Sequence, residues 1–409
     1  VYDVIDESVR WRLNLNNTAP NALTNSLLQA ELQKYIGGVS ALYEDDQFYY
    51  ICSSGYPTYD ILTASSSGSL SDAKNLKIVR KRPTQTTEIY KTTDTSVGVF
   101  IDGTCAYSFR DEDSVKFGEI QTINITQKGS GYKAAPYVLI NNQPNKARAF
   151  LSGETIDRID SLSNDSYSTD PTVTITSGRN AEVRAIVTNG KVTSLVIENP
   201  GEYYSSPPII RITDRSGKGK FASFNSIIDD DGKLVDFERI ETGRLYSQQF
   251  VQVEVISEGK FAGATANIRK WVKNRYTNQQ SSLDQNGGTL FDNKFTTNKK
   301  VYGVISNPRR LRYLLDDNIS NTLVEASILS HSPIIGYAYD GNPIYGPYGY
   351  SDPGDKASSI SRMNSGYSLK SSRPNGPSTT IYSLGTFIDD YKWGKSELTG
   401  KTTLDENNG

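Results

Sequence analysis

The stretch from His331 to Asp352, which reads HSPIIGYAYDGNPIYGPYGYSD, decides how the C-terminal part of this chain folds. Ile334 to Tyr339 has the residue types of a β-strand, and Asp340-Gly341 can supply the positive φ values of a tight turn. Pro343 to Tyr345 then leads the chain back. Glycines and prolines interrupt the sequence directly afterwards, so the returning strand should be short and should lie at the edge of a sheet. The stretch therefore predicts a β-hairpin.

Five tyrosines mark this stretch, and tyrosine suits a half-buried strand because the ring packs while the hydroxyl group stays in water. We take them as candidate residues for surface or glycan contact. They are Tyr337, Tyr339, Tyr345, Tyr348 and Tyr350. The sequence offers no catalytic residue, no cofactor-binding residue and no metal ligand that we would name.

The composition favours a globular, mainly β protein. The chain has 409 residues, of which 36% are hydrophobic and 22% charged, and its 26 tyrosines outnumber its 13 phenylalanines. A net charge of −2 does not favour a nucleic-acid-binding protein. No apolar run approaches the roughly 20 residues that a membrane span needs. The length is enough for two to four domains.

Residues capable of metal or nucleophilic chemistry are few. Cys52 and Cys105 are the only cysteines, and we expect free buried thiols because a disulfide scaffold would use more. His331 is the only histidine, so a zinc site is not expected and a structural role for His331 is favoured. The run Asp229-Asp230-Asp231 lacks the rest of a calcium-binding loop and fits a solvated turn.

The middle of the chain consists of four repeats. Each has a glycine, a second turn residue eleven positions later and a tyrosine three positions after that. The four sets are Gly118/Gly129/Tyr132, Gly153/Asn164/Tyr167, Gly190/Gly201/Tyr204 and Gly232/Gly243/Tyr246. Asn tolerates the left-handed conformation best after Gly, so Asn164 predicts that the second position has a positive φ.

Alternating aliphatic residues flank the turn of each repeat, which indicates about three short strands per unit. A unit of this size cannot bury its own apolar face. Neighbouring units must therefore stack into a solenoid, a prism or a sandwich.

The flanking regions differ from the repeats. Asn21 to Tyr35 has the leucine spacing of an amphipathic helix. The segment VGVFIDGTCAY at 97–107 predicts a second hairpin, which turns at Asp102-Gly103.

Both hairpin segments resemble signatures of YHYH-domain proteins, a family named for a Tyr-His-Tyr-His run. The matching stretch here is Tyr302-Gly303-Val304-Ile305, in which both histidines are missing. The Asn307-Pro308 pair and the Leu311-Arg312-Tyr313 run that follow agree with the family. A metal site that used those histidines is not expected in this chain. The final residues, 404–409, resemble the start of the family's closing segment, which implies a domain cut before its last strands.

The predicted fold class is mainly β, with one short N-terminal helix. Tandem small β modules, which are repeats of about 35–42 residues, are inserted between two parts of a YHYH-like β domain. Residues 1–96 are assigned to an N-terminal mixed module with that helix, 97–117 to the first YHYH-like hairpin and 118–275 to the four β repeats. Residues 276–299, rich in Asn, Gln and Ser at their start, are assigned to a linker. Residues 300–409 are assigned to the second part of the YHYH-like domain, which we expect to be truncated at its C-terminus.

The combination of a split YHYH-like domain with these repeats is similar to large virion proteins of tailed phages that infect cyanobacteria. The resemblance implies a non-enzymatic structural component of a tail, baseplate or fibre, located in the virion and assembled in the host cytoplasm. It implies other virion proteins as partners, a homo-oligomer such as a trimer, a host surface glycan as a further contact, and no cofactor. The alternative is a secreted bacterial surface protein whose YHYH domain binds a ligand or glycan. A third reading, a glycan hydrolase, needs two carboxylates about 5–10 Å apart in a groove, which a sequence does not reveal.

Overall fold

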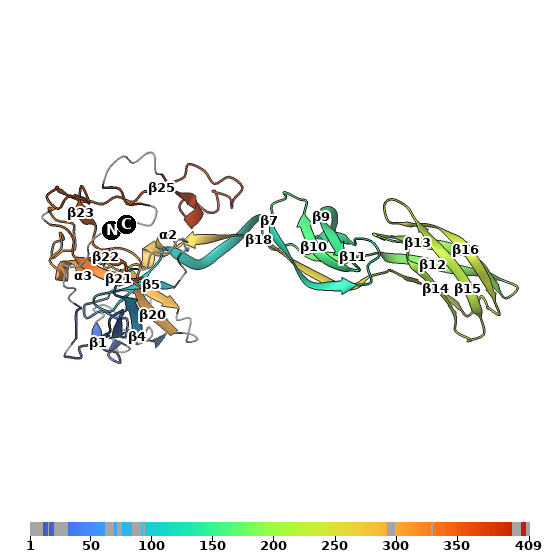
Figure 1. Ribbon diagram of the computed structural model, residues 1–409, viewed down its shortest axis with the longest axis horizontal. Helices are drawn as coiled ribbons and strands as arrows, with labels where there is room; N and C mark the ends of the chain where they lie inside the picture. The colour runs from blue at the N-terminus through green and yellow to red at the C-terminus, as the bar shows by residue number, and fades with distance from the viewer. Residues whose placement is uncertain are drawn as a thin grey trace. The chain divides into compact units, whose positions relative to one another are not determined.

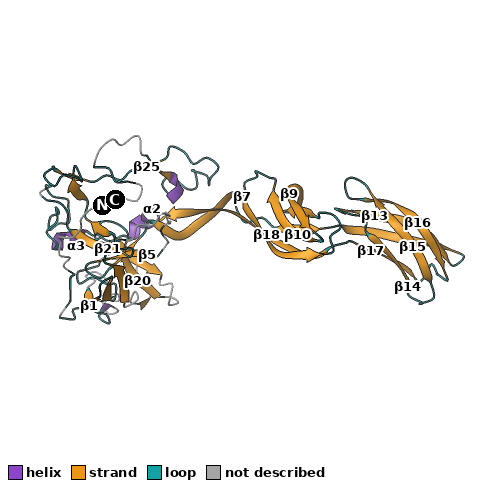
Figure 2. Cartoon of the chain, viewed as in Figure 1, coloured by secondary structure: helices purple, strands orange, loops and turns teal. Residues whose placement is uncertain are grey.

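The computed structural model describes residues 11–14, 16–19, 32–61, 69–71, 76–83, 92, 95–292, 299–328, 330–394 and 402–405 (Figures 1 and 2). Strands predominate among them, so the prediction of a mainly β protein is confirmed. The helical elements in this part of the chain are short: α2 (Arg275–Gln279), α3 (Arg309–Leu314), and the 3-10 turns η1 (Gln280–Ser282) and η2 (Ile388–Asp390). The helix predicted at 21–35 lies mostly outside the described residues.

The chain divides into two compact units, which we call unit 1 and unit 2. Unit 1 comprises residues 1–115, 271–374 and 378–409, and unit 2 comprises residues 116–270 and 375–377. Unit 2 is therefore an insertion within the sequence of unit 1. It holds nearly all of the segment in which the four repeats were found.

Unit 1 is organised by a seven-stranded sheet whose strands come from both sides of the insertion. In spatial order they are β19 (Gly288–Asp292), β20 (Lys299–Val304), β6 (Cys105–Tyr107), β5 (Ser96–Phe100), β21 (Ile334–Ala338) and β22 (Pro343–Tyr345), with β3 (Ser69–Leu70) pairing on β20. β5 and β6 precede unit 2 in the chain, whereas β19 to β22 follow it. The sheet therefore forms only when the two flanks of the insertion come together.

The two predicted hairpins are both confirmed in this sheet. β21 and β22 pair antiparallel with Tyr337 opposite Pro343, and Gly341 in the turn has a φ of 97°. β22 is an edge strand, as the glycines and prolines after it indicated. β5 and β6 form the other hairpin, where Gly103 has a φ of 81°.

Smaller sheets complete unit 1. A three-stranded sheet contains β1 (Val39–Glu44), β2 (Phe48–Ser53) and β4 (Leu76–Arg80), and two pairs are formed by β23 (Tyr348–Tyr350) with β24 (Ile360–Arg362) and by β25 (Tyr367–Leu369) with β26 (Tyr391–Trp393). The largest core cluster includes Tyr56, Phe100, Tyr302, Leu311 and Ile335, so it joins segments that are far apart in the sequence.

The prediction of a linker at 276–299 is wrong for most of the described residues of this segment, because they form helical turns and a strand. Residues 276–282 belong to α2 and η1, and Gly288–Asp292 forms β19, which pairs with β20. The segment is polar because its side chains make internal hydrogen bonds. Asn286, for example, is fully buried and donates from Nδ2 to the carbonyl oxygen of Asp60 at 3.2 Å.

Each of the four repeats supplies three strands, as predicted. The twelve strands, in groups of three per repeat, are β7 (Arg110–Ser130), β8 (Tyr137–Ile140) and β9 (Gln143–Ser152); β10 (Thr155–Ser161), β11 (Val173–Thr176) and β12 (Arg179–Thr188); β13 (Lys191–Glu202), β14 (Ile209–Asp214) and β15 (Lys220–Ile228); β16 (Leu234–Arg244), β17 (Val251–Ile256) and β18 (Lys260–Asn274).

The strands pair across repeat boundaries. The third strand of one repeat pairs with the first strand of the next, which gives β9–β10, β12–β13 and β15–β16, and β18 closes the series by pairing with β7. The middle strands pair as β8–β11 and β14–β17. Two six-stranded modules result. Module A holds β7 to β11 and β18, and module B holds β12 to β17.

Each module has its own core, to which all six strands contribute. Ile120, Val138, Ala149, Ile156 and Ile268 belong to the core of module A. In module B, β13 lies beside β16, β14 beside β15 and β12 beside β17, so the three pairs surround Ala185, Phe224 and Tyr246. Module B is thus inserted between β11 and β18 of module A. The chain enters and leaves it at adjacent points, because Ser177 Oγ donates to the carbonyl oxygen of Gly259 at 3.3 Å.

The repeat tyrosines are held by glycines. A Cβ atom on Gly178 would lie 2.0 Å from the ring of Tyr204, and one on Gly259 would lie 2.2 Å from the ring of Tyr132. The corresponding distance from Gly219 to the ring of Tyr246 is 2.5 Å. Only glycine allows the rings to lie this close to the backbone, so these tyrosines act as core residues of the turns.

The repeat glycines of the turns also behave alike, but Asn164 does not follow them. Gly129, Gly201 and Gly243 have φ values of 65°, 64° and 65°. Asn164, although described, is not among the residues with positive φ, so that prediction is wrong. Its tyrosine, Tyr167, is only half-buried and is not held between two glycines, which removes the need for the tight turn.

Candidate functional site

The five tyrosines that were candidates for surface contact are placed in different surroundings. Tyr337 is buried, with ring centroids 6.1 Å from Trp11 and 6.2 Å from Tyr49. Tyr339 lies with its hydroxyl oxygen 3.1 Å from the hydroxyl oxygen of Ser96. Tyr348 is buried as well. Burial excludes Tyr337 and Tyr348 from direct surface contact.

His331 lies between the remaining two tyrosines. Its ring centroid is 5.3 Å from that of Tyr345 and 4.9 Å from that of Tyr350, and its Nδ1 lies 2.7 Å from the carbonyl oxygen of Ser332. Tyr345 is 37% exposed. The histidine is thus fixed by two rings and one backbone group, which fits the structural role expected of it.

A buried ionic network lies behind this hairpin, centred on Arg312 of α3. Its Nε donates to Oδ2 of Asp317 at 2.5 Å, and its two terminal nitrogens donate to the carboxylate of Glu325 at 2.7 and 3.0 Å. The guanidinium carbon lies 5.7 Å from the ring centroid of Tyr348. Arg312 and Asp317 are both fully shielded from solvent. One buried cation therefore serves two carboxylates.

The hairpin signature is attached to this network through Ser332 and Tyr348. Ser332 Oγ donates to Oδ1 of Asp317 at 2.8 Å and accepts from the backbone nitrogen of Tyr348 at 3.1 Å. The Tyr348 hydroxyl donates to Oε2 of Glu325 at 2.9 Å. The signature residues therefore fix the carboxylates that hold Arg312.

Local structure brings Arg312 into position. α3 begins after Asn307-Pro308, and the backbone nitrogen of Arg312 donates to the carbonyl oxygen of Pro308 at 3.0 Å. Asp316 ends the helix with a φ of 57°, which turns the chain so that Asp317 faces the arginine. Asn307 accepts from Arg312 through Oδ1 at 3.0 Å. The Asn-Pro and Leu-Arg-Tyr runs noted in the sequence thus supply the network, although the sequence did not indicate that role.

The charges of the network are stabilised by their partners. Burial raises the pKa of Glu325, but hydrogen bonds from Arg312 and Tyr348 outweigh it and leave that pKa below its ordinary value. Burial lowers the pKa of Arg312, while its hydrogen bonds to Glu325 and Asp317 raise it above its ordinary value. Burial and the bond to Glu325 raise the pKa of Tyr348. The arginine, the glutamate and the phenol therefore stay in their usual ionisation states at neutral pH.

A second ion pair has the same character. Arg373 donates to both carboxylate oxygens of Asp390 at 2.6 Å, and both side chains are buried. Asp390 Oδ2 also accepts from the backbone nitrogens of Gly385 and Phe387. Burial raises the pKa of Asp390, but the bonds from Arg373 and Phe387 bring it below its ordinary value.

Two buried tyrosine–carboxylate pairs complete the polar interior of unit 1. The Tyr59 hydroxyl donates to Asp102 and the Tyr302 hydroxyl to Asp284, each at 2.9 Å. Burial raises the pKa of Tyr59 and Tyr302 well above the ordinary value. Burial also raises the pKa of Asp102. Asp102 is the turn residue of the hairpin predicted at 97–107, so its hydrogen bond anchors this turn in the core.

The stretch in the position of the Tyr-His-Tyr-His run is buried. A Cβ atom on Gly303 would lie 2.3 Å from the ring of Tyr107, which stacks on Phe291 with centroids 4.2 Å apart. Val304 and Ile305 are buried as well. The space that a histidine would need at position 303 is filled by aromatic rings.

The other side chains that could bind a metal ion or act as nucleophiles do not cluster into a site. Among the described residues, no group of three His, Cys, Asp or Glu side chains is arranged to hold a metal ion. Cys52 and Cys105 are free thiols, as predicted, but only Cys105 is buried as expected, and Cys52 is half-buried. Burial raises the pKa of Cys105 and so keeps it protonated. No helix in the described part of the chain is long and apolar enough to span a membrane.

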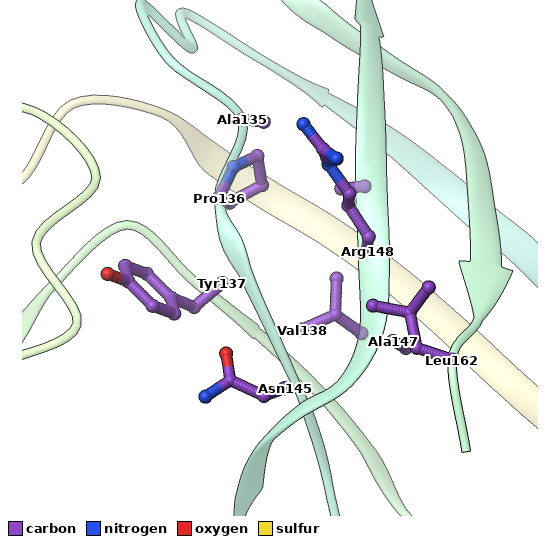
Figure 3. A pocket seen from close by; sticks show the side chains of 9 residues that line it. Ala135, Pro136, Tyr137, Val138, Asn145, Ala147, Arg148 and Leu162 are labelled. Atoms are coloured by element: carbon purple, nitrogen blue, oxygen red, sulfur yellow. The ribbon is translucent and has the colours of Figure 1, made fainter. Parts of the chain in front are cut away.

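A recess of about 300 Å³ lies on module A of unit 2, over β8 and β9 (Figure 3). Its polar side chains are Tyr137, Asn145 and Arg148, and Pro136 and Leu162 contribute apolar walls. None of these residues was singled out as a site residue from the sequence. The sequence held one partial signal, because Pro136 follows the repeat tyrosine Tyr132 by four positions, as Pro171 follows Tyr167 and Pro208 follows Tyr204.

Comparison with known protein families gives a match to the C-terminal part of the chain. The model of the family described as YHYH protein matches residues 317–409. Residues 317–409 form a YHYH domain. No curated protein and no solved structure matches the chain.

The YHYH domain contains Asp317, Glu325, Ser332 and Tyr348 of the first network and both partners of the Arg373–Asp390 pair. Arg312 lies five positions before the matched range, and the stretch at 302–305 lies outside it as well. The Arg373–Asp390 pair therefore lies within the YHYH domain. The Arg312 network instead joins the domain to the helix that precedes it.

Proposed function

We propose that this chain is a non-enzymatic structural component of a phage virion, part of the tail, baseplate or fibre, in which the β units act as a scaffold. The observation that carries the proposal is the closure of unit 2, where β18 pairs with β7 and module B is inserted into module A. Because the first and last strands hold each other, no terminal strand is open to peeling from one end. This construction suits a protein that must stay folded outside a cell for long periods.

The buried ion pairs within and next to the YHYH domain support the same proposal. Arg312 and Arg373 are each held by carboxylates in the protein interior. Breaking such a pair by exposing one partner is strongly unfavourable, so the pairs oppose partial opening. A scaffold gains from this property.

The proposal includes other virion proteins as partners and assembly as a homo-oligomer such as a trimer. Native mass spectrometry of the purified chain tests the oligomer directly. A trimer supports this part of the proposal, and a monomer at micromolar concentrations contradicts it.

The decisive experiment locates the protein. Antibodies against unit 2 are applied to purified phage particles, and gold labels are observed by electron microscopy. Labelling at one position of the tail, baseplate or fibre supports the proposal. Labelling of bacterial envelopes, with unlabelled particles, would instead favour the secreted bacterial surface protein.

The most specific part of the proposal is that the hairpin of β21 and β22 contacts a host glycan. It is supported by Tyr345 and Tyr350, whose rings flank His331. A glycan array probed with the whole chain and with a Tyr345→Ala, Tyr350→Ala variant tests it. Signals that persist in the variant would remove these two tyrosines from the proposal.

A further inference from the structure

The recess on module A lies on a sheet face where polar residues line up across neighbouring strands. In the sheet order β10–β9–β8–β11, Asp160 is opposite Arg148, Arg148 is opposite Tyr137 and Tyr137 is opposite Thr176. Directly opposed residues share one face of a sheet, with Cβ atoms about 4.5–5.5 Å apart. Tyr137, Arg148 and Asp160 therefore form a row on the outer face.

The two arginines near this row, Arg148 and Arg158, differ in whether a carboxylate pairs with them. Arg148 and Arg158 both lie on the ring of Phe150, with guanidinium carbons 5.3 and 4.3 Å from the ring centroid. Arg158 pairs with Asp160, with Nε 2.9 Å from Oδ1. Within the described residues, no carboxylate forms an ion pair with Arg148. Asp160, which lies opposite Arg148, is thus paired with Arg158 instead. The Phe150 ring orients the Arg148 guanidinium.

Two other side chains of the recess, Tyr137 and Asn145, suit the C–H groups and the hydroxyl groups of a sugar ring. Tyr137 is half-buried, and its ring is held by Tyr203 at a centroid distance of 5.5 Å, which fixes a preformed aromatic surface. Aromatic rings present a negative face that attracts C–H edges. The Asn145 amide is exposed and offers both a donor and an acceptor for hydroxyl groups. The volume of about 300 Å³ is at the lower end for ligand sites, which suits one sugar ring rather than a large ligand.

We propose that this recess binds an acidic sugar unit of a polysaccharide, with Arg148 receiving its carboxylate, Tyr137 contacting the ring and Asn145 reading a hydroxyl group. An arginine fork matches a carboxylate through two parallel hydrogen bonds. A sulfated sugar offers related oxygen acceptors and is the other source of the same chemistry. The inference concerns unit 2 alone and does not depend on where the protein resides.

The test is a titration of the whole chain, followed by ligand-observed NMR and calorimetry. The ligands are an oligosaccharide of glucuronic acid, the matched neutral oligosaccharide of glucose and a sulfated glucose oligosaccharide. Binding of the glucuronate ligand, weakened by added salt and absent for the neutral one, is the expected result. Binding of the sulfated ligand alone would replace the carboxylate by a sulfate ester and overturn the assignment to a carboxylate. Equal binding of the acidic and neutral ligands, or no binding at millimolar concentration, also overturns the proposal.

Variants assign the binding to this recess. Arg148→Gln removes the charge-assisted hydrogen bonds and should weaken glucuronate binding about tenfold or more, while Arg148→Lys should retain part of it. Arg211→Gln is the control, because it removes one exposed positive charge from module B of the same unit. Both glutamine variants replace exposed side chains, and circular dichroism checks that they fold. Glucuronate binding that is equal in Arg148→Gln and in the wild type would overturn the assignment.

Discussion

Arg312 donates from its two terminal nitrogens to the two carboxylate oxygens of Glu325, at 2.7 and 3.0 Å. The arginine belongs to a short helix that precedes the YHYH domain, whereas the glutamate lies within the domain. This bidentate pair therefore joins the domain to the segment before it. The third partner, Asp317, makes the network sensitive to the loss of Arg312, because no other cation among the described residues contacts this carboxylate.

Replacement of Arg312 should destabilise unit 1 strongly. Arg312→Ala leaves the buried carboxylate of Asp317 without its cation, and we expect a loss of about 3–5 kcal/mol in the free energy of unfolding. Urea denaturation followed by tryptophan fluorescence reports on unit 1, since Trp11, Trp271 and Trp393 all lie there. The matched control is Lys300→Ala, which also lies in unit 1, breaks an ion pair with the exposed Asp292 and should cost less than about 1 kcal/mol. Equal losses for both variants would contradict this role of Arg312.

Unit 1 should lose stability in acid. The pKa values of Glu325 and Asp390 are lower in the folded chain than in the unfolded chain. Their stabilisation is therefore complete above their unfolded values, about 4.3 and 3.9, and is lost as the pH falls through the folded values. Asp102 acts in the opposite direction, because burial raises its folded pKa and protonation then favours folding.

Two variants separate these contributions to the acid response. Asp390→Asn should lower the stability at pH 7 and flatten its decline toward pH 3. Asp102→Asn should make the decline steeper, because it removes a group that gains stability on protonation. Fluorescence-detected urea unfolding between pH 7 and pH 3 measures both slopes. Identical slopes in both variants and in the wild type would contradict the assignment.

The glycine beside Tyr246 should not tolerate a methyl group. Gly219 has no positive φ, so an alanine there is opposed not by backbone strain but by its neighbours, the ring at 2.5 Å from the new Cβ and Oδ2 of Asp214 at 2.7 Å. We expect a loss of about 3 kcal/mol, the upper part of the range for overpacking. Gly217→Ala, with open space around it but a φ of 74°, should cost about 1 kcal/mol.

Hydrogen exchange of peptides from unit 2 measures both glycine variants, since that unit has no tryptophan. Adding Tyr246→Leu should reduce the cost of Gly219→Ala, because the ring that opposes the methyl group is gone. An unchanged cost in the double variant would show that the ring is not the obstacle.

Module B should be removable from the chain. Because Ser177 and Gly259 are in contact, deletion of residues 179–257 joins Gly178 to Glu258 without a gap that the chain cannot span. We expect module A to keep the exchange protection of β7 to β11 and β18. The control deletes one sequence repeat, residues 153–189, which removes β10, β11 and β12 and should unfold both modules. Equal protection in the two deletions would contradict the division into modules.

Restoring the missing histidines should not restore a metal site. Gly303→His with Ile305→His forces side chains against Tyr107 and Phe291, so the thermal midpoint should fall. Added zinc should leave that midpoint unchanged. Tyr107→Ala in the same background makes room and should recover part of the loss. A zinc-dependent rise in the midpoint would show that the sheet accommodates the family's histidines after all.

The sequence by itself determined the local structure. Asp340-Gly341 and Asp102-Gly103 mark both hairpins because only a few residue types favour positive φ, and the residues after Tyr345 indicated an edge strand because proline and glycine weaken a central one. The spacing of glycine and tyrosine showed four repeats of three strands. Each of these features depends on residues that are close in the chain, so a single sequence contains the information.

The tertiary structure alone decided which strands meet and which polar groups are buried. Alternating aliphatic residues specify a face but not a partner, so the pairing of β18 with β7 and the division into modules A and B were open. Asn164 was misjudged because the need for a positive φ comes from a tyrosine packed between two glycines, which Tyr167 lacks. Arg312 is an ordinary charged residue in the sequence. Its role arises only when two carboxylates from the following domain enclose it, because burial makes each charge depend on partners that are distant in the chain.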